Sequence, residues 1–169
     1  MSREKTRLYI AYGSNLNLPQ MAYRCPSAKV AGRSEIKDYE LVFRGGRRGA
    51  VATIEPLEGG SVPVLLWKIK PQDEAALNRY EGYPNFYRQE MMEVELDGKP
   101  VNAMVYIMND GHEYGSPSDF YLNTIAEGYE SAGFDTEILD DAVEKSMRLA
   151  QEQQAREDAQ YILWEQKWW

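Results

Sequence analysis

The fold is decided first by the stretch LYIAYGSNL at residues 8–16, an aromatic and β-branched run that ends in a Gly-Ser-Asn turn. Residues 8–12 have the composition of a β-strand, and Gly13 ends it. The turn signal at Asp97-Gly98-Lys99-Pro100 predicts an antiparallel hairpin. Further strands are expected at residues 39–43, 50–55, 62–69, 86–96 and 101–108. The first two-thirds of the chain are therefore expected to be rich in β-structure.

Helix signals mark one segment inside the β-rich region and all of the last third. Pro71 suits the first position of a helix, and Gly82 suits a left-handed stop after Glu81, which predicts a helix over 71–81. Apolar spacing becomes helical at 118–131 and again from residue 135 onward. From about residue 150 we expect a helical extension that ends in three tryptophans. These should dock on the body or on a second subunit, so a homodimer is one way to cover them.

Composition narrows the class of protein. A length of 169 residues fits a single domain with its own core, which we expect to span the whole chain. The net charge of −8 argues against nucleic acid as a partner. No apolar run approaches the roughly 20 residues that cross a bilayer, and residues 1–5 precede no apolar segment, so we expect no membrane partner and a cytoplasmic location.

Charge is unevenly distributed, because residues 1–70 carry 12 basic and 6 acidic side chains while the remainder is strongly acidic. A basic first half attracts anionic small molecules. The basic, glycine-rich segment 44–49 offers contacts to an anionic ligand, but a solvated hairpin loop fits it better, since no aromatic residues interleave with the arginines.

Cysteine and histidine are too scarce for several kinds of site. With one Cys and one His, the chain forms no internal disulfide, and a His/Cys metal site is not expected. A Cys25–His112 nucleophile and base pair lacks a third, orienting group. Catalysis, if present, has to use other residues.

The Gly-Ser-Asn turn at 13–15 is the first candidate site. Successive backbone N–H groups in such a turn can hold a carboxylate or an oxyanion. The alternative is an ordinary turn that ends a strand, because Gly, Ser and Asn are common in turns for backbone reasons.

Glu81 is the second candidate, in the aromatic stretch YEGYPNFYR at residues 80–88. A helix C-terminus and apolar neighbours both disfavour an ionised carboxylate, so the pKa of Glu81 should rise toward values useful for proton transfer. The alternative is a surface glutamate paired with Arg79 or Arg88.

Taken together, the 12–16 motif and the helix-terminal Glu81-Gly82 pair resemble the γ-glutamylcyclotransferase family, which includes the AIG2-like proteins. The resemblance covers most of residues 7–132. It is strengthened by the order of three further segments, each similar to a family motif: Cys25–Ala28, Gly49–Ile54 and Val64–Ile69. Gly128, seven residues after Tyr121, also falls where the family has a glycine.

The resemblance implies an α+β fold, a small mixed β-barrel with peripheral helices, and release of 5-oxoproline from a γ-glutamyl compound without a cofactor. Glu81 would be the general acid/base. The backbone of Gly13, Ser14, Asn15 and Leu16 would hold the glutamyl group, and four tyrosines resemble those that line the family's pocket: Tyr12, Tyr87, Tyr106 and Tyr121.

Two functions remain open at this point. One is a cyclotransferase acting on a γ-glutamyl amino acid, peptide or amine. The other is a non-catalytic binding or sensor module that keeps the pocket. The proton-transfer argument for Glu81, together with the resemblance, favours the enzyme.

Overall fold

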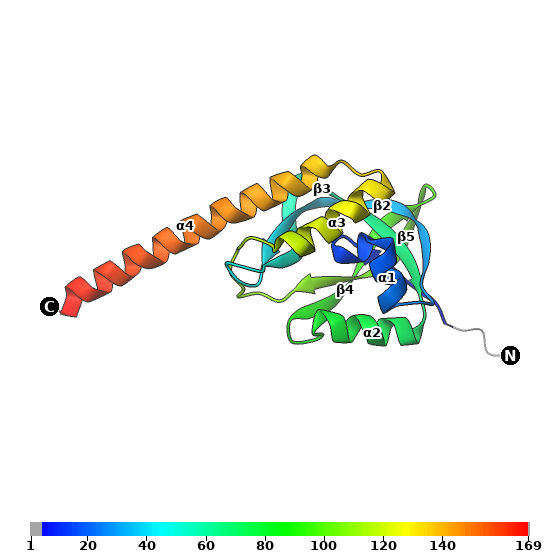
Figure 1. Cartoon of the computed structure of the whole chain (residues 1–169), viewed down its shortest axis with the longest axis horizontal. Helices are drawn as coiled ribbons and strands as arrows, with labels where there is room; N and C mark the ends of the chain where they lie inside the picture. The colour runs from blue at the N-terminus through cyan, green and yellow to red at the C-terminus, as the bar shows by residue number, and fades with distance from the viewer. Residues whose placement is uncertain (1–4, 169) are drawn as a thin grey trace.

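The computed structural model describes residues 5–168, which form one five-stranded sheet with helices around it (Figure 1). The sheet order is β2-β3-β1-β5-β4. Only β1 and β5 are parallel, and the other neighbouring strands are antiparallel. In chain order the elements are β1 (Arg7–Ala11), the 3₁₀ helix η1 (Ser14–Leu16), α1 (Leu18–Arg24), β2 (Lys29–Arg44), β3 (Val51–Ile69), α2 (Pro71–Glu81), β4 (Tyr87–Leu96), β5 (Lys99–Met108), α3 (Asp119–Ala132) and α4 (Thr136–Trp168).

The structure confirms the α+β class and most of the expected elements. The hairpin β4–β5 turns at Asp97 and Gly98, whose φ angles of 53° and 77° are those of a tight hairpin turn. The helix at 71–81 begins and ends as predicted. Strand β2 is longer than the expected 39–43, and the separate strands expected at 50–55 and 62–69 are one continuous strand, β3. The reason is that β2 and β3 pair along most of their length, through segments whose polar residues do not show the alternation of a strand. The short helix α1 was not predicted, although Asn17 caps it and Pro19 lies in its first turn.

The sheet is open, so hydrogen bonds do not close the expected barrel. Its two edge strands, β2 and β4, are held together by side chains instead: a Cβ added at Gly32 would lie 2.8 Å from Leu96 Cδ1. Where the edges diverge, a hollow of about 900 Å³ is lined by residues of both strands, among them Arg33, Lys37, Glu93 and Glu95. Charged side chains there leave each edge unsuited to pairing with another strand.

The core lies between the sheet and the helices. Its fully buried side chains come from all three central strands and from α3, with Ile10, Leu66, Met104 and Ile125 among them. Helix α4 packs on β2 through Leu139, Ala142 and Ser146 and then leaves the body, so that its C-terminal end is far from the sheet (Figure 1). The tryptophans at 164 and 168 therefore do not dock on the body, and Trp169 lies outside the described residues. Within the part of the chain that the structure describes, no helix is long and apolar enough to cross a membrane.

Candidate active site

Two of the candidate segments meet at one small cavity of about 240 Å³. The Gly-Ser-Asn turn after β1 and the C-terminal end of α2 lie on its wall, and the remaining wall comes from β1, β3, β4, β5, α3 and the loop before β4. Its lining residues are Tyr9, Ile10, Tyr12, Gly13, Ser14, Asn15, Val51, Ala52, Tyr80, Glu81, Phe86, Tyr87, Tyr106 and Tyr121. Eight of the nine residues singled out from the sequence therefore lie on this wall, and Leu16 is the exception.

The turn folds as the helix η1, which places its first residues at the cavity. Ser14 and Asn15 are buried, and as the first residues of a helix their N–H groups have no acceptor within that helix. Leu16 is separated from the cavity because its N–H donates to Gly13 O (3.0 Å) and its side chain is fully buried in the core. The loop segment at the cavity is thus shorter than the Gly13–Leu16 stretch expected from the sequence.

Glycine at position 128 allows α3 to lie directly against this loop. A Cβ added at Gly128 would be 2.7 Å from the carbonyl carbon of Leu16 and 2.9 Å from Asn17 N, well inside van der Waals contact. Asn17 is fixed in addition by two hydrogen bonds from its side-chain amide, to Thr124 O and to Glu127 Oε2, each 3.0 Å long. Helix α3 therefore holds the loop after β1 in place.

Glu81 is the last residue of α2 and lines the cavity. Gly82 ends the helix in the left-handed conformation with φ of 62°, and Tyr83 N donates to Asn78 O (3.0 Å), which closes the terminal turn. The ion pairs of residues 5–168 include none between Glu81 and either expected alternative partner, Arg79 or Arg88, and Arg88 instead binds Glu90 (2.7 Å) and Met108 O (2.9 Å). Burial raises the pKa of Glu81 to about 7, against a smaller lowering by the positive charge of Arg24.

Arg24, at the end of α1, connects the loop to the acid. Its guanidinium group lies 3.3 Å above the ring of Tyr80 and donates a short hydrogen bond to Asn15 Oδ1. The hydroxyl groups of Ser14 and Tyr80 are 3.0 Å apart. These contacts tie the loop after β1 to the last turn of α2, and they place one positive charge close enough to affect Glu81.

Three of the tyrosines use their hydroxyl groups on the protein backbone. Tyr12 donates to Tyr106 O and Tyr87 donates to Ala52 O, each at 2.6 Å, while Tyr121 accepts from Ala52 N at 3.0 Å. Burial raises the pKa of Tyr12, Tyr87 and Tyr121 above the ordinary value for tyrosine, so these side chains stay neutral. They therefore form an uncharged wall of fixed rings.

Tyr106 connects the sheet to α2 instead. Its hydroxyl donates to Asn78 Oδ1 (2.6 Å), and the same oxygen accepts from Gln89 Nε2 (2.8 Å). Because Asn78 lies one turn before Glu81 on α2, this link fixes the end of the helix that carries the acid. The roles expected for these tyrosines in holding substrate stay predictions.

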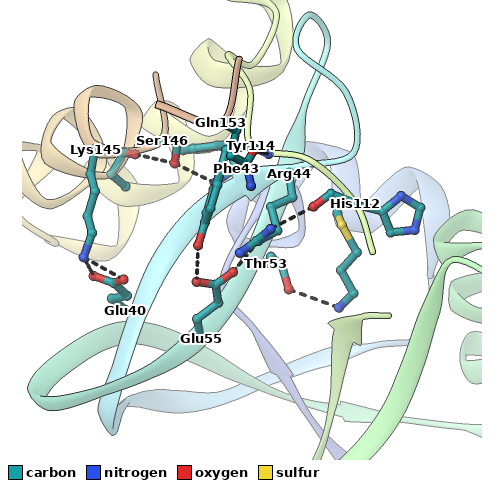
Figure 2. Close-up of polar contacts among 12 residues, drawn as sticks. Glu40, Phe43, Arg44, Thr53, Glu55, His112, Tyr114, Lys145, Ser146 and Gln153 are labelled. Atoms are coloured by element: carbon teal, nitrogen blue, oxygen red, sulfur yellow. Dashed lines mark hydrogen bonds and ion pairs between the residues drawn. The ribbon is translucent and has the colours of Figure 1, made fainter. Parts of the chain in front are cut away.

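The other candidates are placed elsewhere. Cys25 is buried with Sγ 3.6 Å from Asp73 O, and burial raises its thiol pKa to about 11, so it is an unreactive core residue. His112 packs against Phe86 (ring centroids 4.7 Å apart), and its carbonyl oxygen accepts from Arg44 (2.8 Å). The segment 44–49 joins β2 to β3 as a hairpin loop, in which Arg44 pairs with Glu55 (Figure 2). Residues 5–168 contain no group of three or more His, Cys, Asp and Glu side chains placed to hold a metal ion.

Sequence reasoning missed several residues in and around the cavity, and the reasons differ. Tyr9 was interpreted only as a strand residue, yet its hydroxyl accepts from Asn15 Nδ2 (2.9 Å). Tyr80 and Phe86 belong to the aromatic stretch that drew attention to Glu81, and that clustering was the available signal. Arg24 had no signal, because its position depends on a short helix that was not predicted.

Comparison with known proteins gives a consistent family. The family model described as gamma-glutamyl cyclotransferase, AIG2-like, matches residues 9–125. The chain is 28% identical over 143 residues to the human protein named gamma-glutamylcyclotransferase, which covers 79% of this chain and 76% of that protein. The mouse protein of the same name is 28% identical over 142 residues, with 79% and 75% covered.

Solved structures agree with the sequence comparison. One named gamma-glutamyl cyclotransferase superposes with a TM-score of 0.73 at 26% identity, covering 82% of this chain and 86% of that one. The structure of YkqA from Bacillus subtilis shares the fold, with a TM-score of 0.71 at 20% identity over 86% of this chain and 55% of that one.

Proposed function

Because the chain belongs to the gamma-glutamyl cyclotransferase, AIG2-like family, we propose that it cyclises a γ-glutamyl amino acid, peptide or amine to 5-oxoproline and releases the attached amine. The observation that carries this proposal is the shared cavity of Glu81 and the Ser14–Asn15 backbone. An acid/base group and a set of amide donors facing one small space are what an acyl transfer within the substrate requires.

The reaction is an attack by the substrate's own α-amine on its γ-carbonyl carbon. Glu81 accepts a proton from the α-ammonium group, a new C–N bond closes the five-membered lactam, and the C–N bond to the leaving amine breaks. The proton held by Glu81 passes to the leaving nitrogen. The attacking nitrogen also loses a second proton, to water. The released amine takes up one proton from water, so the protons balance over the whole reaction. A pKa of about 7 suits a group that must both accept and return a proton at neutral pH.

The cavity supplies orientation as well as proton transfer. Its volume of about 240 Å³ allows the glutamyl chain little freedom, so a folded substrate keeps its amine near its carbonyl. Oriented reactions within one molecule reach effective molarities on the order of 10⁵ M or more. The amides of Ser14 and Asn15 would hold the substrate's α-carboxylate or stabilise the developing oxyanion, and the neutral tyrosine rings would exclude water.

The test is 5-oxoproline release from a set of γ-glutamyl amino acids, dipeptides and amines. Glu81→Gln keeps the shape of the side chain and removes the proton acceptor, so turnover should fall by about 10²–10⁴-fold. Glu74→Gln is the matched control, because Glu74 lies on the same helix but pairs with Arg7 (2.5 Å) outside the cavity. Wild-type turnover in the Glu81 variant would remove this residue from the mechanism. Tight binding of the compounds without any turnover would favour the binding module.

A further inference from the structure

Two tyrosines of the cavity wall keep a hydroxyl hydrogen that no other group of the protein accepts. Tyr12, Tyr87 and Tyr106 donate theirs to oxygen atoms of the protein. The hydroxyl oxygens of Tyr9 and Tyr121 instead accept from protein N–H groups, at 2.9 Å and 3.0 Å. Within residues 5–168 the structure gives neither hydroxyl an acceptor for its own hydrogen. Each hydrogen is therefore left for a molecule in the cavity.

The direction of the hydrogen bond at Tyr9 is fixed by Arg24. An arginine side chain has only donors, so the bond between Arg24 and Asn15 uses the side-chain oxygen of Asn15. The amide nitrogen of Asn15 therefore faces Tyr9 and donates to the tyrosine oxygen at 2.9 Å. That nitrogen accepts no hydrogen bond in return. The hydrogen of the Tyr9 hydroxyl is thus left for the cavity, which Tyr9 lines.

Tyr9 is held on the most rigid part of the cavity wall. It lies on β1, the middle strand of the sheet, where it pairs with Trp67 of β3 and Met104 of β5. Its side chain is 3% exposed, and its ring packs edge-on against that of Tyr106, with the centroids 5.9 Å apart. A donor fixed in this way does not have to reorganise when charge develops beside it, which makes it effective in catalysis.

The Tyr9 hydroxyl lies near both the acid and the loop after β1. Burial raises the pKa of Tyr9 well above its ordinary value, and among charged groups Glu81 adds most to this rise. Asn15, which bonds to the Tyr9 oxygen, also contributes one of the backbone amides at the cavity. At Tyr121, by contrast, the effect of Tyr80 exceeds that of Glu81. Of the two hydroxyl groups that keep a hydrogen, Tyr9 is therefore better placed for the reacting end of a substrate.

We propose that the Tyr9 hydroxyl donates a hydrogen bond to the γ-carbonyl oxygen of the substrate and stabilises the oxyanion that forms there. This inference rests on the proposed function, since it names a second catalytic group for the same reaction. When the α-amine adds to the γ-carbonyl carbon, the π electron pair of the C=O bond moves to the oxygen. The pair returns to the C=O bond as the leaving amine departs. Tyr9 keeps its proton throughout, because its pKa is raised.

The first test is the steady-state kinetics of Tyr9→Phe with the γ-glutamyl compound that the wild type turns over fastest. Loss of one oxyanion donor should lower kcat by about 10²–10³-fold and leave KM nearly unchanged, since the interaction is made mainly in the transition state. Tyr129→Phe is the matched control and should keep the wild-type kcat. It removes a buried hydroxyl that lies outside the cavity wall and has no hydrogen-bond partner within residues 5–168.

Two kinetic results would overturn the proposal and leave the proposed function standing. A raised KM with the wild-type kcat in Tyr9→Phe would show that Tyr9 only holds the ground-state substrate or positions Asn15. A loss of kcat in Tyr121→Phe, with the wild-type kcat in Tyr9→Phe, would assign the oxyanion to the other hydroxyl.

The second test reads the hydrogen bond directly and does not depend on turnover. 5-Oxoproline keeps the γ-carbonyl oxygen as its lactam oxygen, so its C=O stretch, identified by ¹³C labelling of that carbon, reports hydrogen bonding there. In infrared difference spectra the band of bound 5-oxoproline should lie at lower wavenumber in the wild type and in Tyr129→Phe than in Tyr9→Phe. Equal band positions in the wild type and Tyr9→Phe would overturn the proposal. A wild type that turns over no γ-glutamyl compound would refute the proposed function, and the band would still decide whether Tyr9 bonds to this oxygen.

Discussion

Replacing Glu81 with glutamine should make the protein more stable at pH 8 while removing its activity. The pKa of this carboxyl rises from 4.5 to about 7 in the folded chain, chiefly because burial disfavours the charged form. Each pKa unit corresponds to about 1.4 kcal/mol, so ionised Glu81 lowers the free energy of unfolding by about 3 kcal/mol at most. Glutamine keeps the volume of the side chain but has no charge to desolvate.

The direction in which stability changes with pH follows from proton binding at Glu81. Between pH 4.5 and 7 the folded state holds a proton at Glu81 that the unfolded state has lost, so stability falls as the pH rises through this range. The penalty is about 1.4 kcal/mol at pH 5.5 and about 3 kcal/mol at pH 8, and it is absent well below pH 4.5. The gain of Glu81→Gln over wild type should therefore grow by up to about 2 kcal/mol from pH 5.5 to pH 8.

Urea unfolding of both proteins at pH 5.5 and at pH 8 measures this difference, and both conditions avoid the isoelectric point near 4.8. For a chain of this length, 3 kcal/mol corresponds to an increase in Tm of roughly 6–10 °C. Glu74→Gln, on the same helix but paired with Arg7 near the surface, should show no such gain at pH 8. A Glu81 variant whose gain is the same at both pH values, or which is less stable at pH 8, would refute the idea that this acid is desolvated.

Three other substitutions test the surroundings of the site. Arg24→Gln removes the charge that lowers the Glu81 pKa, so the acidic limb of the pH–rate profile should move to higher pH; Arg24→Lys keeps the charge and should leave the limb in place. Gly128→Ala puts a methyl group 2.7 Å from the backbone of η1 and should cost about 1–3 kcal/mol in chemical unfolding, with a fall in turnover; a variant with wild-type values would show that α3 does not position the loop. Ser146→Ala leaves the buried N–H of Phe43 without an acceptor and should cost about 1–3 kcal/mol, whereas an unchanged unfolding midpoint would contradict the anchoring of α4.

Most of the fold could be predicted from local sequence signals because those signals act over short distances. The helix at 71–81 carries its own start and stop, and the β4–β5 hairpin carries its own turn at Asp97-Gly98. Closure of the barrel could not be predicted this way. It depends on whether β2 and β4, more than 40 residues apart in the sequence, pair by hydrogen bonds, and in this chain they meet through side chains such as Leu96 instead.

A residue of the candidate site could be predicted where its chemical type is energetically unfavourable in its local sequence environment. A glutamate at the end of a helix among aromatic rings is costly to ionise, and this physical conflict drew attention to Glu81. Leu16 was harder to judge, because only the three-dimensional turn shows that its amide is already bonded to Gly13. Arg24 was not predictable, since an arginine is ordinary on a surface helix and gains its role from the packing of α1 beside Tyr80.

Burial acts in opposite directions on the two kinds of ionisable side chain that line the cavity. Its ionisable lining residues are six tyrosines and one carboxylic acid. Burial raises the pKa of Tyr12, Tyr87, Tyr106 and Tyr121 further from neutrality, and the hydroxyl groups of Tyr12 and Tyr87 already donate to backbone carbonyls. The same burial brings the pKa of Glu81 toward neutrality, because desolvation moves an acid of low pKa into the physiological range and an acid of high pKa out of it. One physical cause therefore keeps these four tyrosines neutral and brings the pKa of the glutamate into the range that the proposed proton transfer requires.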